Sequence, residues 1–326
     1  MVKDKELILA TAKYAQEDRS KSWTLMISTL ILWMLAYAGA IVNVHIVPQI
    51  IFAVLAALLN VRFFIIYHDY AHKSLLQNSI LADIVFYIFG LFILAPVSIW
   101  KRSHNFHHAH NSKLYSASIG SYPIATREEF IKASKLERRL YLFARHPFTI
   151  MMGYVFVFIW GMVLRSLINN PKKHLDSLLS LVFHGVLITT IVTTLGWQSL
   201  LIGYFLPIMI AHAMGAYLFY AQHNFPSVKF KNKEEWNYVD AALKSSSYMT
   251  MNKLMHWFTG NIGYHHIHHI NPRIPFYNLP KAFREMEIFQ NPGTTSLSLK
   301  GMIECFKLKV WDPELDRMIG KMEIYR

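Results

Sequence analysis

The sequence contains a single cysteine, Cys305, and few charged residues. One cysteine excludes an intrachain disulfide, a cysteine-ligated zinc site and an iron–sulfur cluster held by this chain alone. Charged residues make up 16 % of the 326 residues, whereas soluble domains carry about 25 %. With 53 % hydrophobic residues and a mean hydropathy of +0.25, the chain is too apolar to be disordered. The composition therefore predicts a membrane protein.

Two long stretches lack charge altogether. No Asp, Glu, Lys or Arg occurs in the 40 residues 22–61 or in the 52 residues 177–228. Because about 20 apolar residues cross one hydrocarbon core, each stretch can cross twice. Asn43 and Gly196 lie near plausible turns at the two midpoints. We predict two helical hairpins, with spans near 23–42, 47–67, 178–196 and 200–220.

Basic residues are concentrated outside these hairpins. The stretch 101–146 contains nine basic and three acidic residues. By the positive-inside rule this stretch, the segment 165–176 and both termini are expected to face the cytoplasm. The rule also explains the formal charge of +13 without a nucleic-acid partner. Residues 1–21 mix acids and bases, so no signal peptide is expected at the N-terminus.

The 17 histidines are the second unusual feature. They form the motifs HDYAH (68–72), HNFHH (104–108) and HHIHH (265–269), and another lies in QHNFP (222–226). Residues spaced i, i+3 and i+4 share one helix face, and neutral imidazole is the commonest protein metal ligand. Nine histidines exceed what one metal ion needs and indicate two. Imidazole suits iron, zinc, copper and nickel, so the spacing leaves the metal open.

Two weaker apolar segments, 84–100 and 146–164, are short for a span. The histidine motifs can meet on one side of the membrane only if neither segment crosses it. We therefore expect both to lie in the membrane interface or to re-enter it, where the aromatic residues of 146–164 would be favourable.

At these motifs the sequence resembles the membrane fatty acid desaturase family, and in particular the bacterial acyl-lipid desaturases. The matching stretches are HDYAH (68–72), RSHNFHHAHN (102–111), QHNFP (222–226) and NIGYHHIHHINPRIPFYNLP (261–280). The resemblance implies two non-haem iron ions, O₂ as co-substrate, and a cis double bond formed in an acyl chain. The implied ligands are His68, His72, His104, His107, His108, His223, His265, His268 and His269.

The resemblance also implies partners. The substrate would be a fatty acyl lipid or an acyl thioester. The sequence has no HPGG motif, no GxGxxG motif and no cysteine cluster, so we expect a separate electron donor that is ferredoxin-like or cytochrome b5-like. One position departs from stearoyl-type relatives, which carry an asparagine four residues before the counterpart of His223. Phe219 stands there. Besides the nine histidines, the second iron would therefore lack an obvious side chain for a tenth, water-mediated contact.

Other polar residues near the motifs have weaker assignments. Asp69, Asn105 and Asn111 are candidates for orienting a ligand imidazole through a hydrogen bond. His110 and His266 are off the repeated spacing, and we expect them not to be ligands. Within the spans, we expect His184 and His212 to be hydrogen-bonded bundle residues, although intramembrane histidines are often functional. Lys101 and Arg102 have two equally good interpretations: they anchor the protein at the membrane surface, or they attract phospholipid headgroups or an acidic electron carrier.

The predicted architecture is an all-α integral membrane protein with four transmembrane helices, two interfacial or re-entrant segments and a cytoplasmic helical cap carrying the metal site. The expected divisions are a cytoplasmic segment 1–22, a membrane domain 23–285 and a cytoplasmic tail 286–326. We expect a multi-pass protein of a bacterial inner membrane. Alternative functions are a related di-iron hydroxylase, alkane monooxygenase or carotenoid ketolase, a metal transporter, whose site would lie nearer the membrane midplane, and a zinc-dependent hydrolase.

Overall fold

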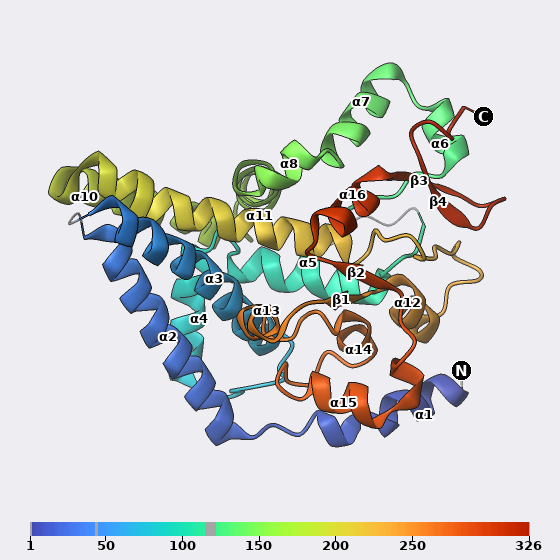
Figure 1. Ribbon diagram of the computed structural model, residues 1–326, viewed down its shortest axis with the longest axis horizontal. Coiled ribbons are helices and arrows are strands. Elements are labelled where there is room, and N and C mark those ends of the chain that lie inside the picture. The colour runs from blue at the N-terminus through green and yellow to red at the C-terminus, as the bar shows by residue number, and fades with distance from the viewer. Residues whose placement is uncertain (1, 43–44, 115–121, 326) are drawn as a thin grey trace.

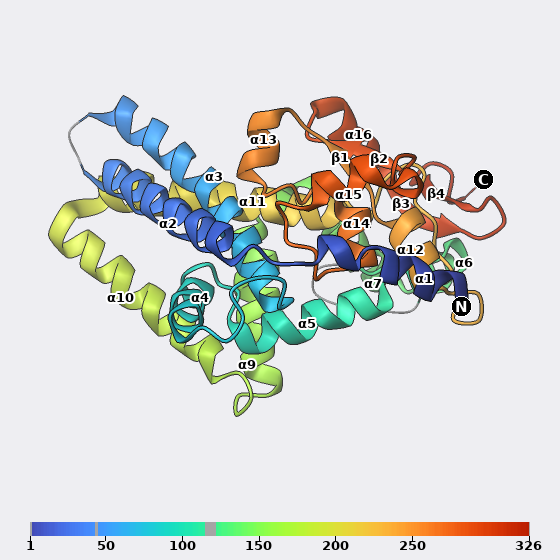
Figure 2. The same cartoon turned by 90° about the horizontal axis from the view of Figure 1, so that it is seen from below.

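A computed structural model describes residues 2–42, 45–114 and 122–325, and it is mostly helical (Figure 1). Three helical stretches are long and apolar enough to cross a membrane: α2 (Arg19–Ile41), α3 (Ile46–Ala71) and a stretch Leu175–Ala221. They extend to one side of the molecule, while the elements after residue 230 gather at the other side with both chain ends (Figures 1 and 2).

Helices α2 and α3 form the first predicted hairpin. Asp18 caps α2, because its carboxylate accepts a hydrogen bond from the backbone N–H of Lys21 at 2.9 Å. In α3, 67 % of the most apolar window is buried, against 22 % in α2. The core of the bundle is therefore built on α3, and α2 exposes most of its apolar surface. Asn43 of the expected turn lies outside the described residues.

The second predicted hairpin is a single helical stretch with a sharp kink. It consists of α10 (Leu175–Gln198), a π-helical segment η3 (Ser199–Phe205) and α11 (Leu206–Ala221). Gly196 adopts φ +83°, which favours glycine and turns the chain. Figure 2 shows α10 and α11 as two arms leaving this bend. The expected turn is thus present, but without a loop.

The two weaker apolar segments are broken helices. Segment 84–100 is divided between α4 (Ile80–Phe92) and α5 (Val97–His110), whose axes differ by 89°. Segment 146–164 contains α8 (Pro147–Met151) and a π-helical stretch η2 (Tyr154–Leu164), followed by α9 (Arg165–Asn169). The bend before α5 directs that helix toward the C-terminal elements (Figure 1).

Two short helices, α6 (Arg127–Lys132) and α7 (Lys135–Ala144), lie between α5 and α8. Each begins with a capping box, Thr126 with Glu129 and Ser134 with Glu137. The N-terminal segment contributes α1 (Val2–Ala10) and a 3₁₀ turn η1 (Ala12–Tyr14).

The C-terminal third is a folded cap and not only a tail. Its helices are α12 (Tyr238–Ser245), α13 (Lys253–Phe258), α14 (His265–Ile270), α15 (Leu279–Glu285), the 3₁₀ turn η4 (Glu287–Phe289) and α16 (Leu299–Lys307). Strands β1 (Tyr248–Thr250) and β2 (Thr294–Ser296) pair in parallel, and β3 (Leu308–Asp312) pairs antiparallel with β4 (Arg317–Gly320). The all-α prediction is wrong here. Strands of three to five residues are too short to show a clear alternation in the sequence.

Candidate metal centre

The structure brings together all nine histidines that the sequence singles out. They form two groups, within each of which the candidate ligand atoms lie within 4.8 Å of one another. The first contains His68, His72, His104, His108 and His268, and the second contains His107, His223, His265 and His269. Eight of the nine residues are buried and His72, at the end of α3, is half-buried.

Three helix ends and one turn carry these side chains. His68 lies in the last turn of α3 and His72 caps its C-terminus. The HNFHH motif occupies the last turns of α5, and HHIHH forms most of the short helix α14. His223 follows α11 by two residues. Each HxxHH motif divides its histidines between the two groups, because neighbours in a helix point about 100° apart.

The ring nitrogens are spaced like ligands of a common ion. In the first group, Nε2 of His108 lies 3.2 Å from Nε2 of His104 and 3.1 Å from Nε2 of His268. In the second, the Nε2 atom of His269 lies 3.2 Å from that of His107 and 3.1 Å from that of His265. Two nitrogens bound at right angles to a metal at about 2.1 Å are about 3 Å apart. The two groups therefore fit metal ions.

The protonation of these histidines also suits metal binding. Burial lowers the pKa of His223 to about 4. Burial, with a smaller contribution from neighbouring imidazoles, holds the pKa values of His265, His268 and His269 well below the usual value. The rings are therefore neutral at pH 7, which is the form that binds a metal.

Two of the imidazoles have a protein partner on the nitrogen opposite the group. Nδ1 of His68 donates to Oδ1 of Asp69 at 3.0 Å, and Nδ1 of His223 donates to the carbonyl of Ser245 at 2.9 Å. Such contacts fix the tautomer that leaves Nε2 free to bind metal. Several of the other rings have no such contact. Their Nδ1 atoms are buried without a hydrogen-bond partner among the described residues: His104, His107, His108, His265 and His268.

Asp69 also joins two motifs that are far apart in the sequence. Its Oδ2 accepts a hydrogen bond from the backbone N–H of Phe276 at 2.6 Å, and Phe276 belongs to the NPRIPFYNLP stretch. The backbone carbonyl of Asp69 accepts a further bond from Ser74 Oγ at 2.9 Å. The carboxylate thus connects His68 to the segment that follows α14.

The two asparagines proposed with Asp69 are placed differently. Asn105 is exposed on the outer face of α5. Asn111 is buried and donates to Ser246 Oγ at 2.9 Å and to the carbonyl of Ala241 at 3.2 Å. Asn111 therefore holds the end of α12, where Ser245 lies, and reaches His223 only through that helix.

Four of the eight histidines outside the two groups are those that the sequence analysis expected not to be ligands. His110 is turned back on its own helix, with Nδ1 2.9 Å from the carbonyl of Phe106, and Nε2 of His266 lies 3.1 Å from the carbonyl of Phe289. His184 contacts Tyr204 OH and the carbonyl of Leu91. The two nitrogens of His212 lie 2.8 and 3.0 Å from the carbonyls of Ile208 and Ile93. These contacts agree with the non-ligand interpretation of all four: His110, His184, His212 and His266.

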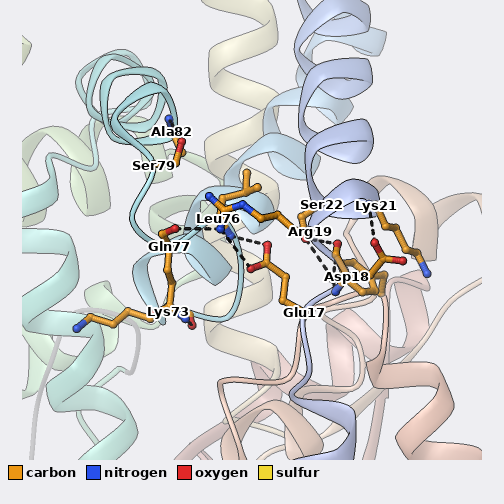
Figure 3. Close-up of polar contacts among 11 residues, drawn as sticks. Glu17, Asp18, Arg19, Lys21, Ser22, Lys73, Leu76, Gln77, Ser79 and Ala82 are labelled. Atoms are coloured by element: carbon orange, nitrogen blue, oxygen red, sulfur yellow. Dashed lines mark hydrogen bonds and ion pairs between the residues drawn. The ribbon is translucent and has the colours of Figure 1, made fainter.

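The loop that follows His72 is held by the N-terminal segment. Lys73, Leu76 and Asn78 all have positive φ angles of 51–59°, which costs energy for residues other than glycine. Figure 3 shows how the loop is fixed: Glu17 Oε1 accepts from the N–H of Leu76 at 2.7 Å, and Arg19 donates to the carbonyl of Gln77 at 3.0 Å.

The same N-terminal segment contacts the stretch after α14. Asn271 Nδ2 donates to Thr11 Oγ1 at 2.9 Å, and Asn278 Nδ2 donates to the carbonyl of Tyr14 at 2.9 Å. Tyr277 OH lies 3.1 Å from Ser22 Oγ. Residues 11–22 therefore bridge the first and third histidine motifs.

An apolar cavity ends at the histidines. It reaches His68 and His104 of the first group and His265 of the second. From Gln222 to Ala211 the cavity follows eleven residues of helix, or about 16 Å at 1.5 Å per residue. Its walls come mainly from α3 and α11, with Phe158 from η2, and include Val61, Phe64, Ile65, Gly215, Leu218 and Phe219.

Sequence reasoning did not find several of these features. Ser245 and Phe276 act through backbone groups, which every residue has, so their identity gives no signal. The cavity does have a signal in the sequence, which is the spacing of Ala211 and Gly215 on α11. Small residues four positions apart leave a hollow on one helix face. Phe219, where stearoyl-type relatives have asparagine, lines the cavity and packs against Trp100.

Comparison with known proteins agrees with this geometry. A family model described as fatty acid desaturase matches residues 45–294. A fatty acid desaturase of Bacillus subtilis (strain 168) is 32 % identical over 98 % of this chain and 91 % of its own length. An sn-1 oleoyl-lipid 12-desaturase of Anabaena variabilis is 24 % identical over 83 % and 78 % of the two chains. A chloroplastic omega-6 fatty acid desaturase of Glycine max is 27 % identical over 69 % of this chain and 53 % of its own length.

These matches identify the protein family of the chain that carries the paired histidine groups and the apolar cavity. The family model covers the first and third motifs and everything between them, and the similarity to the Bacillus subtilis protein extends over nearly the whole chain. The chain belongs to the fatty acid desaturase family.

Proposed function

We propose that this desaturase introduces a cis double bond into a long acyl chain by using O₂ and two electrons at a di-iron centre. The observation that carries the proposal is the contact between the apolar cavity and histidines of both groups. An acyl chain is the apolar, unbranched ligand that such a cavity accommodates, and its burial is favourable by about 0.8 kcal/mol per methylene.

The proposed ligands divide according to the two groups. One iron would be held by His68, His72, His104, His108 and His268, and the other by His107, His223, His265 and His269. Iron held by these residues would supply the oxidising chemistry needed to remove two hydrogens from adjacent methylenes, because methylenes have no acidic proton on which acid–base catalysis could act.

The protein residues have a different task, which is to position the chain and keep water away. Phe64, Leu218 and Phe219 line the cavity and exclude water from the carbons that react. Where the chain meets His68, His104 and His265, the fixed helix ends of α3, α5 and α14 determine which carbons lie nearest the centre. The double-bond position would follow from the depth of the cavity.

We propose a four-span topology with the metal centre on the cytoplasmic side of a bacterial inner membrane. In support, the two hairpin turns lie together: Ser199 Oγ donates to the carbonyl of Ile41 at 2.8 Å, and Gln198 Nε2 donates to Gln49 Oε1 at 2.7 Å. The histidines lie at the opposite ends of α3 and α11. The basic stretch 101–146 favours the cytoplasmic side for those ends.

In this arrangement residues 1–22 and 286–326 flank a membrane domain of residues 23–285. The N-terminal part contacts the stretch after α14 through Thr11 and Tyr14. The two electrons would come from a separate ferredoxin-like or cytochrome b5-like protein. The proposed substrate is the acyl group of a membrane lipid or of an acyl thioester.

Expression in a host without desaturases tests the function. The fatty acids of cells expressing the chain, the His107→Ala variant or the His110→Ala variant are compared by gas chromatography and mass spectrometry. We expect one new unsaturated acyl species with the unmodified chain and with His110→Ala, and none with His107→Ala. A hydroxylated product instead of an alkene would favour a related monooxygenase, and no new product would contradict the proposal.

A further inference from the structure

A second, larger groove lies next to the metal centre and shares no lining residue with the apolar cavity. It runs between α5 and the η2–α9 segment. One part of its wall is apolar, with Ile99 and Phe106 from α5, and another part is polar, with Arg102, Arg165 and Asn169. A groove with both kinds of wall suits an amphipathic ligand.

The described residues that line this groove include two guanidinium groups and no carboxylate. None of the ion pairs among the described residues includes Arg102 or Arg165. His174, which also lines the groove, has its pKa lowered by burial and further by the positive charge of Arg102, so it is neutral at pH 7. Asp176 does not line the groove, and its carboxylate is occupied by two hydrogen bonds from Ser98 at 2.6 and 2.8 Å.

The groove lies where the apolar outer surface of the molecule ends. Arg165 directly follows η2, which exposes Trp160, and His174 directly precedes α10, which exposes Leu175 and Leu178. A basic residue at the end of an apolar helix lies at the depth of lipid headgroups. Two guanidinium groups at this depth match the bidentate geometry of a phosphate.

We propose that this groove binds the phosphate of a glycerophospholipid and that this lipid is the form in which the enzyme receives its acyl chain. The substrate part rests on the proposed desaturase function. The groove and the apolar cavity are lined by neighbouring residues of the same two elements, Ser103 and His104 in α5 and Gly161 and Phe158 in η2. A lipid held at Arg102 and Arg165 therefore has its acyl chains beside the elements that line the cavity.

The test compares the double variant Arg102→Gln/Arg165→Gln with Lys172→Gln/Lys173→Gln. The control removes the same charge from two exposed lysines close to the groove that do not line it. Each purified protein is titrated with phosphatidylglycerol in nanodiscs of otherwise neutral lipid. Because hydrogen bonds to charged groups are lost, we expect the double variant to bind at least about tenfold more weakly. The control should bind like the unmodified protein, and iron content should be equal in all three.

A second arm measures desaturation of phosphatidylglycerol and of acyl-CoA by each protein. We expect the double variant to show a raised KM for phosphatidylglycerol with little change in kcat. Unchanged phosphatidylglycerol binding by the double variant overturns the groove assignment, and desaturation of acyl-CoA but not of the phospholipid overturns the substrate assignment. If the unmodified protein desaturates neither, while the double variant has lost phospholipid binding, the headgroup site stands and the proposed reaction fails.

Discussion

The carboxylate of Asp69 accepts a hydrogen bond from Nδ1 of its neighbour His68 at 3.0 Å. Both residues are buried in the last turn of α3. The other carboxylate oxygen accepts from the backbone of Phe276 at 2.6 Å, so one side chain fixes an imidazole and anchors the segment that follows α14. Replacing it should affect the metal site through a residue that does not touch the metal position.

We predict that Asp69→Ala weakens iron binding by about 10- to 100-fold, the usual effect of removing the partner of a ligand histidine. Asp69→Asn should have a smaller effect, because an amide oxygen can still accept from His68 while the amide nitrogen meets the N–H of Phe276. The measurement is the iron retained by the purified protein at increasing chelator concentration.

Asp316→Asn is the matched control for this change. Asp316 is exposed, pairs with Lys229 and lies in a turn with a positive φ that asparagine tolerates. It should retain iron like the unmodified chain. Iron retention by Asp69→Ala equal to that of the control would show that His68 does not depend on this carboxylate.

The grouping of the nine histidines could be predicted from the sequence because they lie in local motifs. HxxxH and HxxHH place histidines on one helix face wherever a helix forms, and α3, α5 and α14 carry them in that way. The charge-free stretches likewise indicated the long apolar helices, since few structures other than membrane spans tolerate 40 residues without charge.

The parts that could not be predicted depend on contacts between distant segments. The π-helical segments η2 and η3 have no local signal in the sequence. Pro96 marks where the chain bends between α4 and α5, but the angle of 89° depends on how the two helices pack. The N-terminal segment looked separable because its sequence is polar, yet Thr11 and Tyr14 contact residues more than 250 positions away. The groove at Arg102 and Arg165 exists only once α5 and α9 are side by side.

The division of histidines into two groups predicts how iron is lost. Each group offers enough ring nitrogens for one ion of its own. If each holds one iron as proposed, His72→Ala and His107→Ala should each lower iron from about two to about one per chain. His110→Ala, at a half-buried residue that contacts the carbonyl of Phe106, should leave the iron content unchanged. Iron and protein are quantified on the same sample by plasma mass spectrometry. Full iron content in His72→Ala and His107→Ala would contradict the assignment of those residues.

The loop after His72 should open when its clamp is removed. Glu17 is mostly buried, and its carboxylate is the acceptor for the N–H of Leu76 in a loop with three left-handed residues. We expect Glu17→Ala to destabilise the closed loop by about 1–2 kcal/mol. Amide hydrogen exchange in residues 73–78 should then be about 5- to 30-fold faster.

Glu6→Ala tests whether any loss of N-terminal charge has this effect. Glu6 lies exposed in α1, and the variant should exchange like the unmodified chain. Equal exchange rates in residues 73–78 for Glu17→Ala and the unmodified chain would mean that packing of Leu75 and Leu76, both fully buried, holds the loop without the carboxylate.

The cavity predicts a change in chain-length preference when it is filled. Gly215 lines the cavity, and a Cβ built there would lie 3.7 Å from Phe158 Cζ, so a longer side chain would extend into the space between them. If Gly215→Leu displaces two methylenes of substrate, it removes about 1.6 kcal/mol of burial and disfavours long chains over short ones by about tenfold. Gly185→Leu is the control, because Gly185 is exposed on α10 with no atom within 4 Å of its Cβ position. Product analysis with acyl chains of graded length should show the shift only for Gly215→Leu, and an unchanged length profile would exclude this cavity as the acyl site.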